Sequence, residues 1–437
     1  MSFSIAKYKN NPVLLGTFWL TLSGLLCKSM GFFYRIFLSR TIGAEGLGVY
    51  QLAMPFFVLL LALCSTAIST GVTRLVSYDS KYASGYLVIA LFISTVLCLL
   101  LGSILYLFSD YIANTWLKEE LCGFLLRIIA LTIFPCAWHN CINGYCFGRK
   151  KTVVPASSQF LEQFCRILIM LLLYQYCKKN NLPFEIKHVG IGLLAGELAG
   201  FITVYHVFYK MRKPKFWKID KSHYQSFFHI VIPLSTNQLL MNLFSSLELI
   251  LIPNMLVLYG YPKEEALQVF GVFTGMALSL IFAPSVLIHS LAVMLLPEVS
   301  EASKACNLKR IFSLIHKVLW FGLIFGIVCG VFFYVFRLFF ANNIFKNALV
   351  EGYLQRLCFL CPLLYIESLL HSFLNGQCYS RELLVFNLIS CSLRILVILF
   401  GIPRLGMDVY ILGLIAGSAL NITLSLLYLA KKKGPSS

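Results

Sequence analysis

Charged residues are scarce in this sequence: Asp, Glu, Lys and Arg make up 12% of its 437 residues, and the chain has only 18 acids. Hydrophobic residues instead account for 59% of the chain, and its mean hydropathy is +0.81. Soluble domains carry about 25% charged residues, so a soluble globular protein is excluded. The composition predicts a polytopic membrane protein.

The chain also lacks the short motifs of nucleotide and peptide hydrolysis. It has no GxxxxGK[ST] phosphate loop and no HExxH zinc motif, and its nearest approach to GxSxG, at residues 67–71, lacks the first glycine. The CxxC of Cys358 and Cys361 begins an apolar segment, where two packing thiols are expected. We therefore expect a protein that is not an enzyme and has no cofactor and no metal site.

Long apolar runs are what the sequence does contain. A helix needs roughly 20 apolar residues to cross a bilayer, and the runs here do not alternate with the period of two that a barrel requires. The sequence therefore predicts an all-α membrane protein of about twelve transmembrane helices. The expected segments are 12–38, 48–76, 84–108, 121–147, 154–177, 188–209, 224–258, 266–297, 308–340, 352–378, 382–402 and 407–430.

Basic residues set the expected orientation. Lys7 and Lys9 precede the first apolar run, which is too long for a signal peptide and lacks a cleavage site, so we expect it to remain as a helix. Loops on the same side as the N-terminus carry most of the loop Lys and Arg, which predicts that both termini are cytoplasmic. The net charge of +18 is spread over loops without a common face, so nucleic acid is not an expected partner.

Internal repetition divides the chain in two. The run Asn-Gly-x-Cys-x-x-Arg occurs at 143–149 and 375–381, residues 48–77 align with 271–300, and Gly-Leu-x-Ala-Gly occurs at 192–196 and 413–417. These matches, in the same order, predict two parallel six-helix repeats. The expected lobes are 1–210 and 224–437, and a basic cytoplasmic linker that touches anionic lipid is expected at 211–223. Two such lobes predict alternating access to a central cavity.

Four cations are candidates for binding cargo in that cavity. Lys28, Arg35, Arg166 and Arg394 lie within the expected helices, where an unpaired charge costs several kcal/mol, on the order of 2.5–3.5. This excess of cations suits an anionic cargo such as a phosphate. Glu162 is four residues before Arg166, so a structural ion pair between these two is an equal alternative.

Acids and histidines inside the helices are candidates for ion coupling. We select Glu162, Glu248, Glu367 and His289, and Glu248 ranks first because no basic residue lies within one turn of it. His289 and His371 could change charge near neutral pH, although a lone helical histidine is more often a packing residue.

Two stretches of the sequence resemble a known family. KSMGFFYRIFLSRTIGAEGLGVYQLAMPFF at 28–57 and IPLSTNQLLMNLFSSLELILIPNMLVLYGY at 232–261 are similar to the stage V sporulation protein B branch of the multidrug/oligosaccharidyl-lipid/polysaccharide (MOP) flippases. The resemblance implies a V-shaped, two-lobed, MATE-like fold. It also implies a monomer that flips an undecaprenyl-pyrophosphate-linked saccharide across the bacterial cytoplasmic membrane, for peptidoglycan or spore cortex. Expected partners are this lipid-linked saccharide, membrane lipids and a coupling cation, H⁺ or Na⁺.

The sequence departs from the related lipid II flippases in the first helix. Their pattern is Ser-Arg-x-x-Gly-Phe-x-Arg, and here Lys28 replaces the first arginine and Tyr34 stands at the second. Family members also commonly carry fourteen helices, whereas twelve are expected here. Two alternatives stay open: an ion-coupled small-molecule or drug antiporter that depends on Glu248, and a membrane scaffold that transports nothing.

Overall fold

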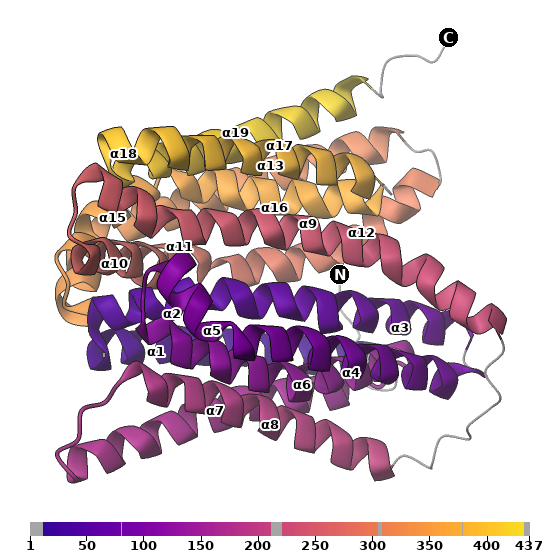
Figure 1. The fold of residues 1–437 in the computed structure, drawn as a ribbon. Coiled ribbons are helices and arrows are strands. Elements are labelled where there is room, and N and C mark those ends of the chain that lie inside the picture. Colours follow the sequence, from indigo (N-terminus) through magenta and orange to yellow (C-terminus); the bar gives the residue numbers. More distant parts are fainter. Residues whose placement is uncertain (1–11, 80, 211–220, 305–307, 378, 432–437) are drawn as a thin grey trace. The chain divides into compact units, whose positions relative to one another are not determined.

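The computed structural model describes residues 12–79, 81–210, 221–304, 308–377 and 379–431, which are almost entirely helical and contain no strand (Figure 1). The all-α prediction is confirmed. Ten helices in this part of the chain are long and apolar enough to cross a membrane, or eleven if the bent pair α15–α16 is counted as one span. The helix α1, in which we expected the first of twelve spans, is not among the ten.

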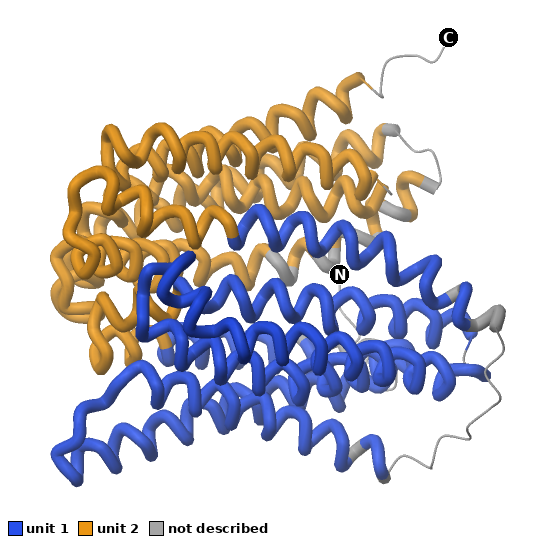
Figure 2. Tube along the Cα trace, viewed as in Figure 1, with its two compact units in different colours: residues 1–34, 52–246 blue, residues 35–51, 247–437 orange. Residues whose placement is uncertain are grey.

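The chain forms two compact units, residues 1–34 with 52–246 and residues 35–51 with 247–437 (Figure 2). The helices before the second unit's main part are α1 (Pro12–Thr41), α2 (Gly43–Leu61), η2 (Ala62–Thr66), α3 (Ala67–Tyr78), α4 (Ala83–Leu107), α5 (Ser109–Tyr111), η3 (Ile112–Leu117), α6 (Leu121–Gly148), α7 (Val153–Lys179), α8 (Ile186–Lys210) and α9 (Lys221–Tyr259). The later helices are α10 (Lys263–Gly271), η4 (Val272–Ala277), α11 (Leu278–Phe282), α12 (Ser285–Lys304), α13 (Leu308–Val335), α14 (Arg337–Phe339), η5 (Phe340–Phe345), α15 (Leu349–Leu357), α16 (Leu360–Gly376), α17 (Ser380–Leu396), η6 (Val397–Gly401), α18 (Ile402–Leu405) and α19 (Met407–Lys431).

The boundaries of the compact units fall inside α1, α2 and α9, not at the linker. The end of α1 joins the second unit because Arg40 donates hydrogen bonds to the carbonyl oxygens of Asn343 and Ile344, at 2.5 and 2.8 Å. The division into lobes at 1–210 and 224–437 describes the repeat in the sequence and stays a prediction. Residues 211–220 of the expected linker lie outside the described residues.

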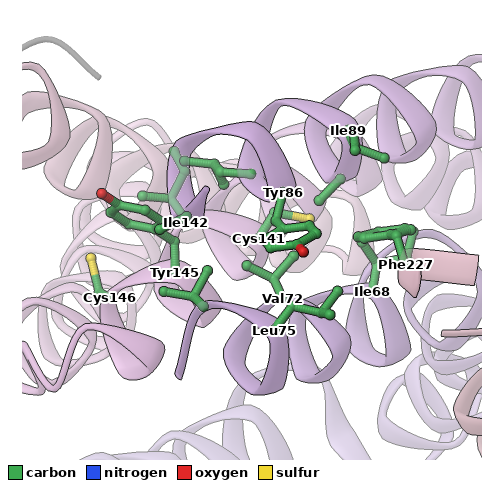
Figure 3. Close-up of a cluster of buried hydrophobic side chains, with 14 of the residues drawn as sticks. Ile68, Val72, Leu75, Tyr86, Ile89, Cys141, Ile142, Tyr145, Cys146 and Phe227 are labelled. Atoms are coloured by element: carbon green, nitrogen blue, oxygen red, sulfur yellow. The ribbon is translucent and has the colours of Figure 1, made fainter. Parts of the chain in front are cut away.

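The core of the first unit forms where α3, α4 and α6 meet, with Phe227 of α9 against them (Figure 3). Gly144 of α6 allows the close approach of α3, because a Cβ at this position would lie 2.5 Å from the carbonyl oxygen of Ser69. Thr73 then donates a hydrogen bond to the Gly144 carbonyl oxygen at 2.9 Å. Close approach through small residues is how membrane helices associate. The Asn-Gly-x-Cys-x-x-Arg run is thus part of a helix contact, and Cys146 within it packs in the core.

The repeat is visible in the hydrogen bonds of the two halves. Ser69 of α3 donates to the carbonyl oxygen of Asn140 on α6, at 2.7 Å. In the second half, Ser372 of α16 donates to the carbonyl oxygen of Ala292 on α12, at 2.5 Å. Ser372 stands at the position equivalent to Asn140, and Ala292 at the position equivalent to Ser69. The same helix contact is therefore bonded in both halves, with the donor on opposite helices.

The two halves also share a helix ending that the sequence analysis did not predict. The π-helical turns at 112–117 and 340–345 each end at a lysine in the left-handed conformation, Lys118 (φ 53°) and Lys346 (φ 54°). In both, the next backbone amide donates to the carbonyl six residues earlier, at 2.8 and 3.0 Å. A left-handed residue commonly closes a helix end in this way. The sequence contains the same pattern, Ala-Asn-x-x-x-Lys, at 113–118 and at 341–346, and this match could have predicted the shared helix ending.

Gly144→Ala tests the contact between α3 and α6. We expect it to lower the free energy of unfolding by about 1–3 kcal/mol, because overpacking a close contact costs about this much. Thermal unfolding of the purified protein in detergent measures the change. Gly352→Ala on α15 is the control, since an added Cβ there has no heavy atom within 4 Å. Equal unfolding midpoints for the two variants would contradict the contact.

Candidate functional site

A buried cluster of ionisable side chains joins α6, α7 and α8 in the first unit, where α7 packs along α8 (Figure 1). Arg166 of α7 donates to Glu162 at 2.8 Å and to Glu197 of α8 at 3.0 Å. These three side chains are 12%, 14% and 5% exposed. The ion pair between Glu162 and Arg166, kept as an alternative in the sequence analysis, is present. Glu197 is a second partner that the sequence did not assign.

His139 of α6 completes this cluster. Its Nδ1 lies 3.9 Å from Oε2 of Glu162 and 4.0 Å from Oε2 of Glu197, and its Nε2 lies 3.0 Å from the hydroxyl oxygen of Ser158. Sequence reasoning did not select His139. The signal was available, because the Asn-Gly-x-Cys-x-x-Arg alignment pairs His139 with His371, the histidine that was noticed.

Glycines of α8 make room for the cluster. A Cβ at Gly196 would lie 2.9 Å from Cβ of Arg166, and a Cβ at Gly200 would lie 2.9 Å from Cε1 of His139. Both distances are shorter than ordinary carbon contacts. Glycines recur at every fourth residue of α8, at 192, 196 and 200, a spacing that is typical of close contacts between membrane helices. The cluster therefore depends on the absence of side chains at these two positions.

The second unit holds Arg394, the other candidate arginine that is mostly buried. Arg394 of α17 donates from Nε to Oε1 of Glu248 on α9, at 2.8 Å, and their side chains are 17% and 8% exposed. No base lies within a turn of Glu248 on its own helix, but a helix 146 residues further along the chain supplies one. Gly417 of α19 lies against the Arg394 side chain, 3.1 Å from its Cγ when a Cβ is built, as Gly196 lies against Arg166.

Glu367 of α16 lies in an amide network. Asn421 of α19 donates to Oε1 of Glu367 at 2.8 Å and to Oδ1 of Asn387 on α17 at 2.6 Å. His371, one turn after Glu367, places Nε2 at 3.7 Å from Oε1 of the same glutamate. The two asparagines were not selected from the sequence, because a single buried amide carries no distinctive pattern. His289 lies on α12, and its side chain is outside the described part of the structure.

Lys28 and Arg35 differ from the two buried arginines. Both are exposed on α1 and, within the described residues, neither forms an ion pair. They are seven residues apart, and two helical turns place such residues on one face. Of the four candidate cations, Arg166 and Arg394 are therefore paired with carboxylates. Lys28 and Arg35 form no ion pair within the described residues.

Comparisons with known proteins agree with this architecture. The model of a family described as polysaccharide biosynthesis protein matches residues 13–303, which is well over half of the chain. The chain belongs to this family. It is 27% identical over 340 residues to stage V sporulation protein B of Bacillus subtilis (strain 168), covering 74% of this chain and 65% of that protein. It is 24% identical over 220 residues to lipid II flippase MurJ of the same organism, covering 47% of this chain and 40% of that one.

Solved structures show the fold of this family member. An inward-facing multidrug resistance MATE family transporter of the MOP superfamily matches with a TM-score of 0.74 and 15% identity, over 94% of this chain and 96% of the transporter. An outward-facing MATE family transporter matches with a TM-score of 0.66 and 15% identity, over 99% and 98%. The predicted MATE-like fold is confirmed.

Arg166→Met tests whether the cluster holds α7 to α8. It would leave Glu162 and Glu197 facing each other without their cation, and removing one partner of a buried ion pair costs about 3–5 kcal/mol. We expect the unfolding midpoint in detergent to fall, and Glu162→Gln in the same chain to restore part of it. Arg35→Met is the control, because Arg35 is exposed. A midpoint for Arg166→Met equal to that of Arg35→Met would show that the ion pairs contribute nothing.

Proposed function

We propose that this protein moves a lipid-linked saccharide, carried on undecaprenyl pyrophosphate, across the bacterial cytoplasmic membrane for peptidoglycan or spore cortex synthesis. The family, the sporulation and lipid II flippase relatives and the MATE-like fold support a transporter that works by alternating access. The protein acts as a monomer in contact with membrane lipids and catalyses no covalent chemistry.

The observation that carries the proposal is the pair of available cations on α1. An unpaired charge on a membrane helix is costly unless it faces water or an anionic partner. Lys28 and Arg35 share one face, at a spacing of two turns, or about 10 Å along the helix axis. A pyrophosphate headgroup offers several anionic oxygens, which an arginine binds bidentately and a lysine binds as a point charge.

Arg166 and Arg394 have a different part in this proposal. Each can bind the cargo only after releasing a glutamate, so cargo binding competes with its ion pair. A cation that neutralises Glu248 weakens the ion pair of Arg394, and one that neutralises Glu162 weakens one of the two ion pairs of Arg166. Ion coupling through Glu162, Glu248, Glu367 and His289 then links a H⁺ or Na⁺ gradient to cargo release.

Transport in proteoliposomes tests the proposal. A fluorescent undecaprenyl-pyrophosphate saccharide is added, and a membrane-impermeant quencher reports how much has changed leaflet. We expect Lys28→Gln/Arg35→Gln to slow flipping at least about tenfold, because a hydrogen bond to a charged group contributes about 1.5–3 kcal/mol and 1.4 kcal/mol is a factor of ten. Lys178→Gln/Lys179→Gln, exposed at the end of α7, removes the same charge and should flip normally.

The alternatives give different results in the same assay. A drug or cation antiporter, favoured by the multidrug transporters of the same fold, would transport no lipid and would lose drug exchange in Glu248→Gln alone. A scaffold would move neither cargo while remaining folded. Either result overturns the proposed flippase.

Both termini are proposed to lie on the cytoplasmic side. Green fluorescent protein fused after residue 437 should fluoresce, because it folds in the cytoplasm, and alkaline phosphatase inserted in the 180–185 turn should be active, because it folds outside. The positive-inside distribution of Lys and Arg is the physical reason. An inactive phosphatase at 180–185 together with a dark C-terminal fusion would reverse the orientation.

A further inference from the structure

We propose that Cys177 and His188, at the turn between α7 and α8, form a binding site for one divalent transition metal ion such as zinc. The inference goes beyond the proposed function, and binding at this site does not depend on which cargo is carried. No metal site was expected from the sequence, because ten residues separate the cysteine from the histidine and this spacing matches no common metal motif.

The two side chains meet at one end of the α7–α8 pair (Figure 1). Sγ of Cys177, in the last turn of α7, lies 3.6 Å from Nε2 of His188, in the first turn of α8. Zinc binds thiolate sulfur at about 2.3 Å and imidazole nitrogen at about 2.0–2.1 Å, so two such ligands at a tetrahedral angle are about 3.5–3.6 Å apart. The observed separation is therefore that of two ligands on one zinc ion. Thiolate and imidazole also favour zinc and copper over calcium or magnesium.

Backbone atoms of Glu185 hold the imidazole of His188 in position for a metal ion. The Glu185 N–H donates to Nδ1 at 3.0 Å, and the Glu185 carbonyl oxygen lies 3.1 Å from the same nitrogen. Without a metal ion, Nε2 keeps the ring proton and donates it to Sγ of Cys177. When the ion binds, Nε2 presents its lone pair to the metal, so the proton moves to Nδ1 and is donated to the Glu185 carbonyl. Histidines that bind metals commonly donate their second ring N–H to a backbone carbonyl in this way.

The turn that carries the two ligands has a well-defined backbone. Asn181 adopts the left-handed conformation (φ 53°), and the Leu182 N–H donates to the carbonyl oxygen of Cys177 at 2.8 Å. Phe184 stacks on the imidazole of His188, with 5.1 Å between the ring centroids and 15° between the ring planes. Ligands that are held in this way lose little conformational freedom when an ion binds.

Burial gives the two ligands different parts in binding. Cys177 is 2% exposed, whereas His188 is partly exposed, so the ion reaches the thiol from the imidazole side. The Cys177 thiol gives up its proton to water, and its sulfur then bonds to the metal in place of the proton. The bound ion joins the end of α7 to the beginning of α8.

The charges of the turn permit a cation. Lys178 and Lys179 are exposed, so water and salt screen their repulsion of the ion, and a neighbouring ammonium group favours the thiolate. Glu185 is the only acid between the two ligands, and its half-exposed carboxylate pairs with Lys187 at 2.8 Å. This carboxylate and water are available for the remaining coordination positions.

The second half of the chain has no such pair. With the matches of 166–168 to 394–396 and of 192–196 to 413–417, Leu405 and Val409 stand at the positions of Cys177 and His188. The corresponding helices, α17 and α19, also pack along each other. The fold of the repeat therefore does not require a thiol and an imidazole at these positions.

Binding of Co²⁺, a coloured substitute for zinc, to the full-length protein in detergent tests the site. Wild-type protein should bind one Co²⁺ per chain with a sulfur-to-cobalt charge-transfer band in the near ultraviolet, and Zn²⁺ should abolish the band. Changes beside a metal ligand already cost about 10–100-fold in affinity, so Cys177→Ser and His188→Gln should each weaken binding at least about tenfold. Glutamine at 188 can still accept the Glu185 N–H, which keeps the cap of α8. Cys165→Ser on α7 and His206→Gln on α8 are the matched controls and should bind as wild type does.

X-ray absorption of the zinc-loaded protein identifies the ligands directly. The spectrum of wild type should contain one sulfur at about 2.3 Å and nitrogen at about 2.0–2.1 Å, and that of Cys177→Ser should lack the sulfur. A wild-type protein with neither the charge-transfer band nor the sulfur would show that the pair is only a hydrogen bond. Wild-type affinity and band in Cys177→Ser, eluting as folded monodisperse protein, would also overturn the site. Neither assay contains a lipid-linked saccharide, so failure here leaves the flipping test unaffected.

Discussion

The structure depends on one constraint, that a charge inside a membrane helix must meet an opposite charge or a polar partner. Arg166 and Arg394 satisfy it with carboxylates from neighbouring helices, at 2.8–3.0 Å. These contacts require the helices to lie in one register, because a shift by one turn would separate the charged groups by about 5 Å. The Arg166–Glu197 pair therefore helps to set the register of α7 along α8, and the Arg394–Glu248 pair links α17 to α9.

Small residues make these ion pairs sterically possible. Lipid chains are as apolar as leucine, so helices in a membrane associate by close packing, not by burial from water. Gly196 and Gly417 let a neighbouring arginine side chain lie flat along the helix before it reaches its carboxylate. Gly144 acts in the same way: because it has no side chain, the carbonyl and hydroxyl oxygens of Ser69 on α3 can lie against α6. Glycine positions thus determine where polar groups can be buried.

Much of the fold followed from the sequence because its signals are local or periodic. Composition and run length predicted the helices, and the repeated Asn-Gly-x-Cys-x-x-Arg and Gly-Leu-x-Ala-Gly runs predicted the duplication that equivalent hydrogen bonds now display. The partner of Glu248 could not be predicted, because a search within one turn cannot find an arginine 146 residues away. His139 was missed because buried histidines are usually packing residues. The compact units also differ from the repeats, since contacts of Arg40 join the end of α1 to the second unit.

Both halves have an arginine at the same position of the repeat, Arg166 and Arg394, but the glutamates that pair with it come from different positions. Arg-Ile-Leu at 166–168 recurs at 394–396, and with this match and that of 192–196 with 413–417, Ser390 and Ser418 stand at the positions of Glu162 and Glu197. Arg394 pairs instead with Glu248 of α9. In the first unit all charged members of the cluster lie on α6, α7 and α8, so neutralising a glutamate acts within that unit. Glu248 lies two residues after the point where α9 leaves the first compact unit. Its ion pair therefore lies within the second unit and links α17 to the last part of α9.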